Sequence, residues 1–147
     1  MNREIEFRGR NYSDGIWVYG DLEYERNNGL LSKVRIHTYK DDGSYDRQHL
    51  VESNTVGEFT GMRDKHGKKI FEGDILDVTV FDCFDNDEQY RVRVEWVGTE
   101  FMGVDVTNDD FEWNLCWLCN QDDEIEIIGN IFDNPRLIKT LSNEQTV

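Results

Sequence analysis

The sequence has little proline, little cysteine and no long hydrophobic run. Its 147 residues include one proline and three cysteines. An odd number of cysteines suits a reducing compartment better than a set of disulfide bonds. No apolar stretch has the length needed to cross a bilayer, and residues 1–5 lack the hydrophobic core of a signal peptide. We therefore expect a protein that stays in the cytoplasm that makes it, away from membranes.

The sequence also lacks a group of residues that could carry out a reaction. A general base needs a nucleophile or an orienting carboxylate within reach. The three histidines, His37, His49 and His66, each stand alone among strand or turn residues, and we interpret them as surface or turn histidines. No phosphate-binding loop is present. The sequence predicts no catalytic residues, no cofactor and no enzymatic activity.

Cys116 and Cys119 have the C-x-x-C spacing of half a zinc site or of a redox pair. A zinc site needs four ligands, but no second pair follows and Cys83 is distant in sequence. A redox pair would open a helix, whereas residues 111–118 alternate aromatic and polar side chains like a strand. We interpret the pair as small, buried apolar residues without a metal.

Negative charge is concentrated in the second half of the chain. The formal net charge is -15. Residues 1–73 hold 13 acidic and 12 basic side chains, net -1, while residues 74–147 hold 18 acidic and 4 basic side chains, net -14. Binding of nucleic acid needs a basic surface. We therefore expect no direct nucleic-acid binding by the acidic half.

Short alternating segments separated by glycine turns predict an all-β protein. The clearest segment is residues 90–96, in which Tyr, Val and Trp alternate with Arg and Glu. Similar segments occupy residues 4–8, 16–24, 34–38, 56–60, 75–81, 101–106 and 124–131, with a weaker one at 48–52. Gly20, inside one of them, suggests a bulge or a bend.

We expect two small β units that together form one domain. Residues 1–69 would form an N-terminal β unit, and residues 70–147 have the strand number and length of an SH3-like barrel. Asn134 and Pro135 have the order of a helix cap followed by a first-turn proline. They predict a short C-terminal helix that ends at residue 141, with no longer helix elsewhere.

A basic turn at residues 65–69 is one candidate interaction surface. Its charged side chains are Lys65, His66, Lys68 and Lys69. The turn could contact phosphate or an acidic partner, or it could be a solvated hairpin tip. In an oligomer it could also meet the acidic half of a neighbouring copy.

Three acidic clusters in predicted loops form a second candidate surface. They comprise Asp82, Asp85, Asp87 and Glu88, then Asp109, Asp110 and Glu112, then Asp122, Asp123 and Glu124. A calcium loop requires regular ligand spacing and a glycine at its sharp turn, which residues 82–89 lack. The clusters are either solvated loops or a set of carboxylates that mimics a phosphate backbone.

Three segments resemble the YopX family. They are Phe59-Thr60-Gly61 with Asp64-Lys65 and residues 67–75, the opening residues 3–9 with Trp17-Val18-Tyr19-Gly20, and the closing residues 127–135. Departures from the family pattern are small: Glu58, Met62 and His66. The resemblance implies a mostly β protein encoded by bacteriophages or prophages, so that the cytoplasm would be that of a bacterial host. It brings no established activity and no catalytic residues.

The leading hypothesis is a non-enzymatic accessory protein that acts through contacts with an unidentified protein partner and forms homo-oligomers. The alternative is an acidic DNA mimic that inhibits a host DNA-binding protein, and it depends on the net charge of residues 74–147.

Overall fold

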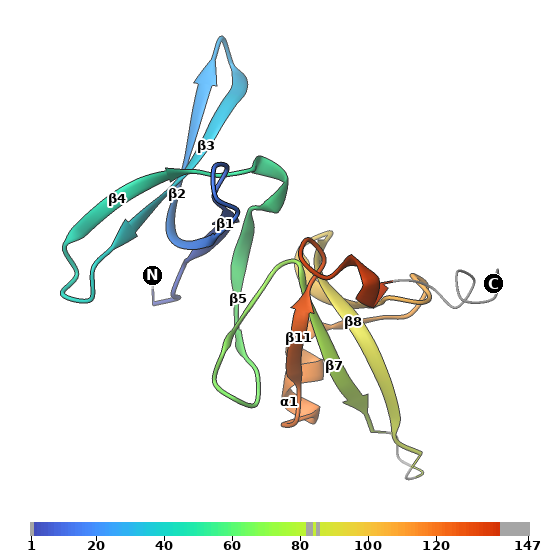
Figure 1. Ribbon diagram of the computed structural model, residues 1–147. Helices are drawn as coiled ribbons and strands as arrows, with labels where there is room; N and C mark the ends of the chain where they lie inside the picture. The colour runs from blue at the N-terminus through green and yellow to red at the C-terminus, as the bar shows by residue number, and fades with distance from the viewer. Residues whose placement is uncertain (1, 82–83, 85, 139–147) are drawn as a thin grey trace. The chain divides into compact units, whose positions relative to one another are not determined.

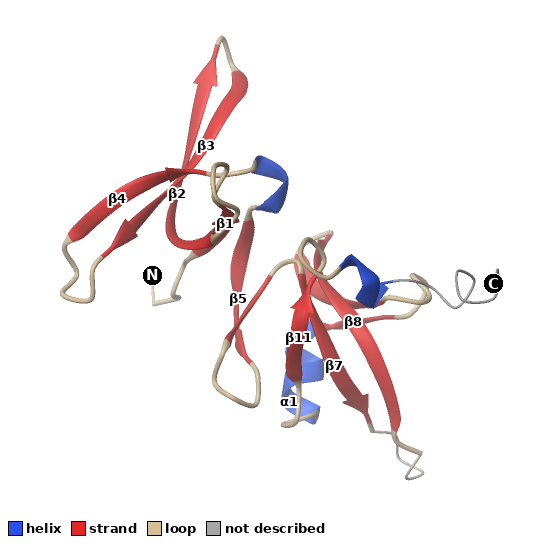
Figure 2. Cartoon of the chain, viewed as in Figure 1, coloured by secondary structure: helices blue, strands red, loops and turns tan. Residues whose placement is uncertain are grey.

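The chain divides into two compact units, unit 1 (Met1–Phe59) and unit 2 (Thr60–Val147). The structure, a computed structural model, describes residues 2–81, 84 and 86–138 (Figure 1). Strands dominate both units, as predicted, and helical segments are short (Figure 2). No helix in the described residues is both long enough and apolar enough to span a membrane. The division of one domain into β units at residues 1–69 and 70–147 stays a prediction.

Unit 1 is an antiparallel sheet with a small core. Its elements are β1 (Phe7–Arg10), β2 (Trp17–Asn27), β3 (Leu30–Tyr39), β4 (Tyr45–Leu50), the 3-10 helix η1 (Ser53–Thr55) and the first residues of β5 (Gly57–Arg63). The strands follow the order β4-β3-β2-β1-β5. Val34, Ile36 and Val51 are buried on one face, because successive side chains of a strand point to opposite faces. The other face is exposed to solvent.

Unit 2 is built on a five-stranded antiparallel sheet. Its strands are β6 (Lys69–Phe71), β7 (Asp74–Val80), β8 (Glu88–Val97), β9 (Glu100–Asp105), β10 (Glu112–Asn114) and β11 (Glu126–Asn130), and its helices are α1 (Leu115–Gln121) and the 3-10 helix η2 (Pro135–Ile138). The sheet has the order β10-β9-β8-β7-β11, and β6 pairs with the end of β5. The predicted alternation of residues 90–96 is confirmed, since Val92 and Val94 are buried.

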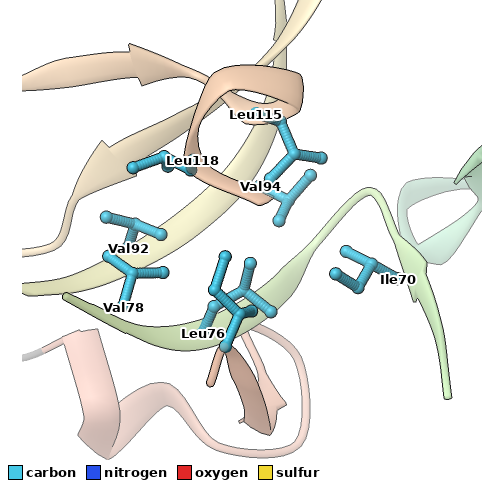
Figure 3. Close-up of a cluster of buried hydrophobic side chains, with 8 residues drawn as sticks. Ile70, Leu76, Val78, Val92, Val94, Leu115 and Leu118 are labelled. Atoms are coloured by element: carbon cyan, nitrogen blue, oxygen red, sulfur yellow. The ribbon is translucent and has the colours of Figure 1, made fainter. Parts of the chain in front are cut away.

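The SH3-like barrel predicted for residues 70–147 is not confirmed, because neither sheet closes over the described residues. A helix covers the core instead. In Figure 3, Leu115 and Leu118 of α1 point toward Val92 and Val94 of β8. Leu118 also fits against Gly103, where an added Cβ would lie 2.7 Å from its Cδ1 atom.

The prediction of a strand over residues 111–118 is wrong beyond Asn114. The Asn114 side chain accepts a hydrogen bond from the Trp117 amide at 3.0 Å and so caps α1. Leu115 and Leu118 lie three positions apart, so both face the core only from a helix. At the C-terminal end, the described part of the predicted helix is a 3-10 helix, and residues 139–141 lie outside the described part.

Gly20 is required because β3 approaches β2 closely at this point. A Cβ atom added to Gly20 would lie 1.9 Å from the carbonyl oxygen of His37. We expect Gly20→Ala to lower the free energy of unfolding by about 3 kcal/mol, the upper part of the range for overpacking. Urea unfolding followed by circular dichroism measures this change. Ser13→Ala, in an exposed turn, serves as the control, and equal stabilities of the two variants would contradict the prediction.

Candidate interaction surface

The basic turn at residues 65–69 is shaped by Asp64, which is buried at the end of β5. One oxygen, Oδ1, accepts hydrogen bonds from the backbone amides of His66 and Lys68, both with an N–O distance of 2.9 Å. The other, Oδ2, accepts the amide of Ile127 in β11 at 3.2 Å. Asp64 therefore fixes the turn and attaches it to β11.

This environment sets the ionisation of Asp64. Burial of the side chain acts to raise the pKa, but the amides of Lys68, Ile127 and His66 stabilise the charged form more strongly. The net result is a pKa of Asp64 below its ordinary value.

The basic side chains at the start of the turn face carboxylates of their own unit. Lys65 Nζ lies 3.4 Å from Glu126 Oε2 and 4.0 Å from Glu124 Oε2. His66 Nε2 lies 3.4 Å from Glu126 Oε1. Lys68 is exposed and Lys69 is half-buried. The start of this turn is therefore paired with carboxylates of its own unit, in β11 and just before it. Contact with phosphate or with a neighbouring copy stays a prediction.

One predicted acidic surface residue is a buried structural group. Asp122 is 2% exposed and accepts the amides of Thr79 at 2.7 Å and Glu124 at 2.9 Å. It therefore joins the end of α1 to β7, and its assignment to an interaction surface was wrong. The sequence gives no sign of this burial, since Asp122 and Asp123 look alike.

The other acidic residues of the three clusters are exposed wherever the structure describes them, and several have partners. Asp109 accepts a hydrogen bond from Arg93 at 2.8 Å, and Glu88 accepts one from the Tyr90 hydroxyl. Asp87, Asp110 and Asp123 are exposed. Val80 pairs with Glu88 and the amide of Thr79 bonds to Asp122, so the first and third clusters lie at the same end of β7. Asp82 and Asp85 lie outside the described residues.

The C-x-x-C pair lies on α1 and not on a strand. Cys116 is exposed, contrary to the prediction that both cysteines are buried, and Cys119 is partly buried. Burial raises the pKa of the Cys119 thiol to about 11. No group of metal-ligating side chains is found among the residues described, and Cys83 lies outside them.

A surface that the sequence did not single out lies on the solvent face of the β2–β3–β4 sheet. We call it the tyrosine face, and its residues are Asp21, Glu23, His37, Tyr39 and Tyr45. Tyr39 and Tyr45 pair across β3 and β4 with ring centroids 5.8 Å apart. Their positions on either side of the turn at residues 41–43 were the available signal, because residues flanking a hairpin turn symmetrically lie opposite each other.

Hydrogen bonds fix the side chains of the tyrosine face. The Tyr39 hydroxyl donates to Asp21 at 2.8 Å, and this bond raises the pKa of the Tyr39 phenol. His37 lies between two partners, with Nδ1 3.0 Å from the Tyr45 hydroxyl and Nε2 3.0 Å from Glu23. Tyr39 is 49% exposed and Tyr45 is 52% exposed. The face therefore presents ordered aromatic rings to solvent.

We expect Asp64→Asn to destabilise the protein and to weaken its response to acid. An amide nitrogen in place of Oδ2 cannot accept from Ile127, which costs about 1–3 kcal/mol at neutral pH. Because the pKa of Asp64 is lowered by folding, its contribution is present above the ordinary value of 3.8 and is lost as the pH falls through the folded value. Urea unfolding between pH 7 and 2 should show that the free energy of unfolding falls less with decreasing pH in the variant than in the wild-type protein. Parallel profiles would contradict the assignment.

We expect Cys116 to react with iodoacetamide much faster than Cys119. With a pKa of about 11, the Cys119 thiol carries about a thousandth of its population as thiolate at pH 8, and thiolate is the reactive form. Cys116 is exposed. Timed alkylation followed by peptide mapping measures both sites, and unfolding in urea should remove the difference. Equal rates in the folded protein would contradict the burial of Cys119.

The comparison with solved structures supports the fold. The chain is similar to protein EF1440 from Enterococcus faecalis, whose crystal structure gives a TM-score of 0.56 at 17% sequence identity. The similarity covers 94% of this chain and all of the other. No curated protein matches the chain.

The family comparison agrees with the motifs at residues 3–9, 59–75 and 127–135. The sequence profile described as YopX protein matches residues 6–139, nearly the whole length. The chain belongs to the YopX family.

Proposed function

We propose that this chain is a phage- or prophage-encoded accessory protein of the bacterial cytoplasm that acts through protein contacts and has no catalytic activity. The tyrosine face is the observation that carries the proposal. Tyrosine is enriched in protein interfaces and among the residues that contribute most of their binding energy. Here the rings are exposed on a sheet whose opposite face already covers the core.

The order of these side chains favours binding. A flexible side chain loses about 0.5–1.5 kcal/mol of conformational freedom when a partner fixes it. Tyr39 and Tyr45 are held by Asp21 and His37 before any partner arrives. A partner therefore gains the apolar contact with less of this cost. Self-association through the same face belongs to the proposal.

An acidic DNA mimic is the second candidate, and the charge of unit 2 favours it. Residues 60–147 hold 20 acidic and 8 basic side chains, net -12. Asp87, Asp110 and Asp123 are exposed. The burial of Asp122 reduces the number of carboxylates that a DNA-binding protein could contact.

Pull-down from a lysate of the bacterial host, followed by mass spectrometry, tests both functions. We expect Tyr39→Ser with Tyr45→Ser to weaken capture of the partner by at least about tenfold, as for residues central to an interface. Tyr24→Ser is the matched control, because Tyr24 is 48% exposed and pairs with Val34, on the other face.

The DNA mimic predicts a different result. Capture should then depend on Asp87→Lys, Asp110→Lys and Asp123→Lys, and it should weaken steeply with salt. Turnover of nucleotides or nucleic acid by the purified chain, together with no captured protein, would overturn both candidates.

A further inference from the structure

The outer half of β3 has an open edge. Pairing between β3 and β4 begins at Arg35 with Leu50, and the Val51 amide donates to the Val34 carbonyl at 3.0 Å. Toward the hairpin tip, β3 continues over Leu30–Lys33 with β2 on one side. No described strand pairs with Leu30–Lys33 on the other side. A strand with an unpaired edge is a template for a further strand.

The edge is open because the chain turns away from β3 after Val51. Val51 forms an isolated antiparallel bridge with Asn11, and the Glu52 amide donates to the Arg10 carbonyl at 2.9 Å. The Glu52 carboxylate is bound to Arg10 Nε at 2.7 Å. Residues 51–54 are thereby drawn toward β1, which separates them from β3.

A groove of about 410 Å³ lies at this separation. It is lined by residues 31–34 of β3, residues 50–54 and Tyr12. Side chains of consecutive strand residues point to opposite faces of a sheet. A hollow lined by four consecutive residues of β3 therefore follows the edge of the strand and does not lie over one face.

The lining combines apolar side chains with polar ones and with two opposite charges, Lys33 and Glu52, and the Glu52 carboxylate is paired with Arg10. Leu31, Leu50 and Tyr12 are exposed at 47%, 40% and 68%, and the buried Val34 and Val51 also line the groove. These side chains can surround an apolar side chain of a ligand.

Lys33 supplies the positive charge. The neighbouring arginines form ion pairs within the unit. Arg35, two residues further along β3, pairs with Glu25 at 3.3 Å, and Arg10 of β1 pairs with Glu52. No carboxylate within 4.0 Å of Lys33 is found in the described residues. Lys33 is therefore available to an anion that enters the groove.

We infer that this groove binds an extended segment of a partner protein, which adds a strand to the edge at Leu31–Lys33. The segment carries an apolar side chain that enters the groove and an acidic side chain that faces Lys33. Main-chain hydrogen bonds supply affinity in this mode of recognition, and the side-chain positions supply selectivity. The inference rests on the proposed function. It adds a second binding surface, separate from the tyrosine face, and names the kind of segment that this surface would bind.

Synthetic peptides test the inference with the full chain. Three fluorescein-labelled heptapeptides alternate valine with threonine and differ at one position, which carries glutamate, lysine or serine. We expect the glutamate peptide to bind about tenfold more tightly than the lysine peptide, because attraction replaces repulsion at a partly exposed site. In Lys33→Glu this order should reverse. Lys40→Glu, in the exposed turn between β3 and β4, is the matched control and should keep it.

Backbone methylation tests strand addition without changing the protein. Only alternate amides of an added strand bond to its neighbour. Two forms of the glutamate peptide, N-methylated at odd or at even positions, should therefore differ, with one losing binding and the other keeping it. The amide NMR signals of residues 31–34 should shift on binding.

Several results would overturn the inference. They are equal binding of the two methylated forms, shifts confined to other residues, no binding of any peptide at millimolar concentration, and tighter binding of all three peptides to Lys33→Ala. The last result would mean that Lys33 only protects the edge from pairing. A dimer in sedimentation velocity that Lys33→Glu abolishes would show that a second copy occupies the edge. Partner capture that depends on Tyr39 and Tyr45 would stand independently of these failures.

Discussion

Buried aspartates that accept backbone amides hold the turns of unit 2, and the rest of that unit depends on them. Asp64 joins the β5–β6 turn to β11, and Asp122 joins α1 to β7. Asp74 accepts the Phe71 amide at 2.8 Å, and Asp105 accepts the Thr107 amide at 3.1 Å. A carboxylate is tolerated in the interior only when hydrogen bonds replace its contacts with water. Each of these aspartates can be buried only because it accepts hydrogen bonds from backbone amides, and the same hydrogen bonds fix a turn.

This use of aspartate changes the meaning of the net charge. A net of -12 over residues 60–147 suggests a surface covered with carboxylates. Asp64, Asp74, Asp105 and Asp122 are nevertheless buried, and Glu124 and Glu126 lie beside Lys65. The charge that a partner could meet is smaller than the composition indicates. The DNA-mimic hypothesis accordingly depends on the exposed loop residues alone.

Unit 1 follows a different physical pattern. Among the described residues, the buried members of its core cluster are Val34, Ile36 and Val51, with half-buried side chains around them. A thin sheet of this kind covers one face and leaves the other to solvent. The exposed face and the unpaired edge of β3 both arise because unit 1 is a single sheet with few buried side chains. Both candidate surfaces of unit 1 therefore have the same structural origin.

The sequence by itself determined the local features of this protein. Alternation placed the strand at residues 90–96, glycines placed the turns, and the motif at residues 59–75 identified the family, because each signal depends on neighbours along the chain. The tertiary structure decided the rest. Asp122 and Asp123 are adjacent in sequence, yet only Asp122 reaches the amide of Thr79. Leu115 and Leu118 become helical because a core lies beneath both. The edge of β3 opens because Val51 pairs with Asn11, a contact between distant residues that no local pattern contains.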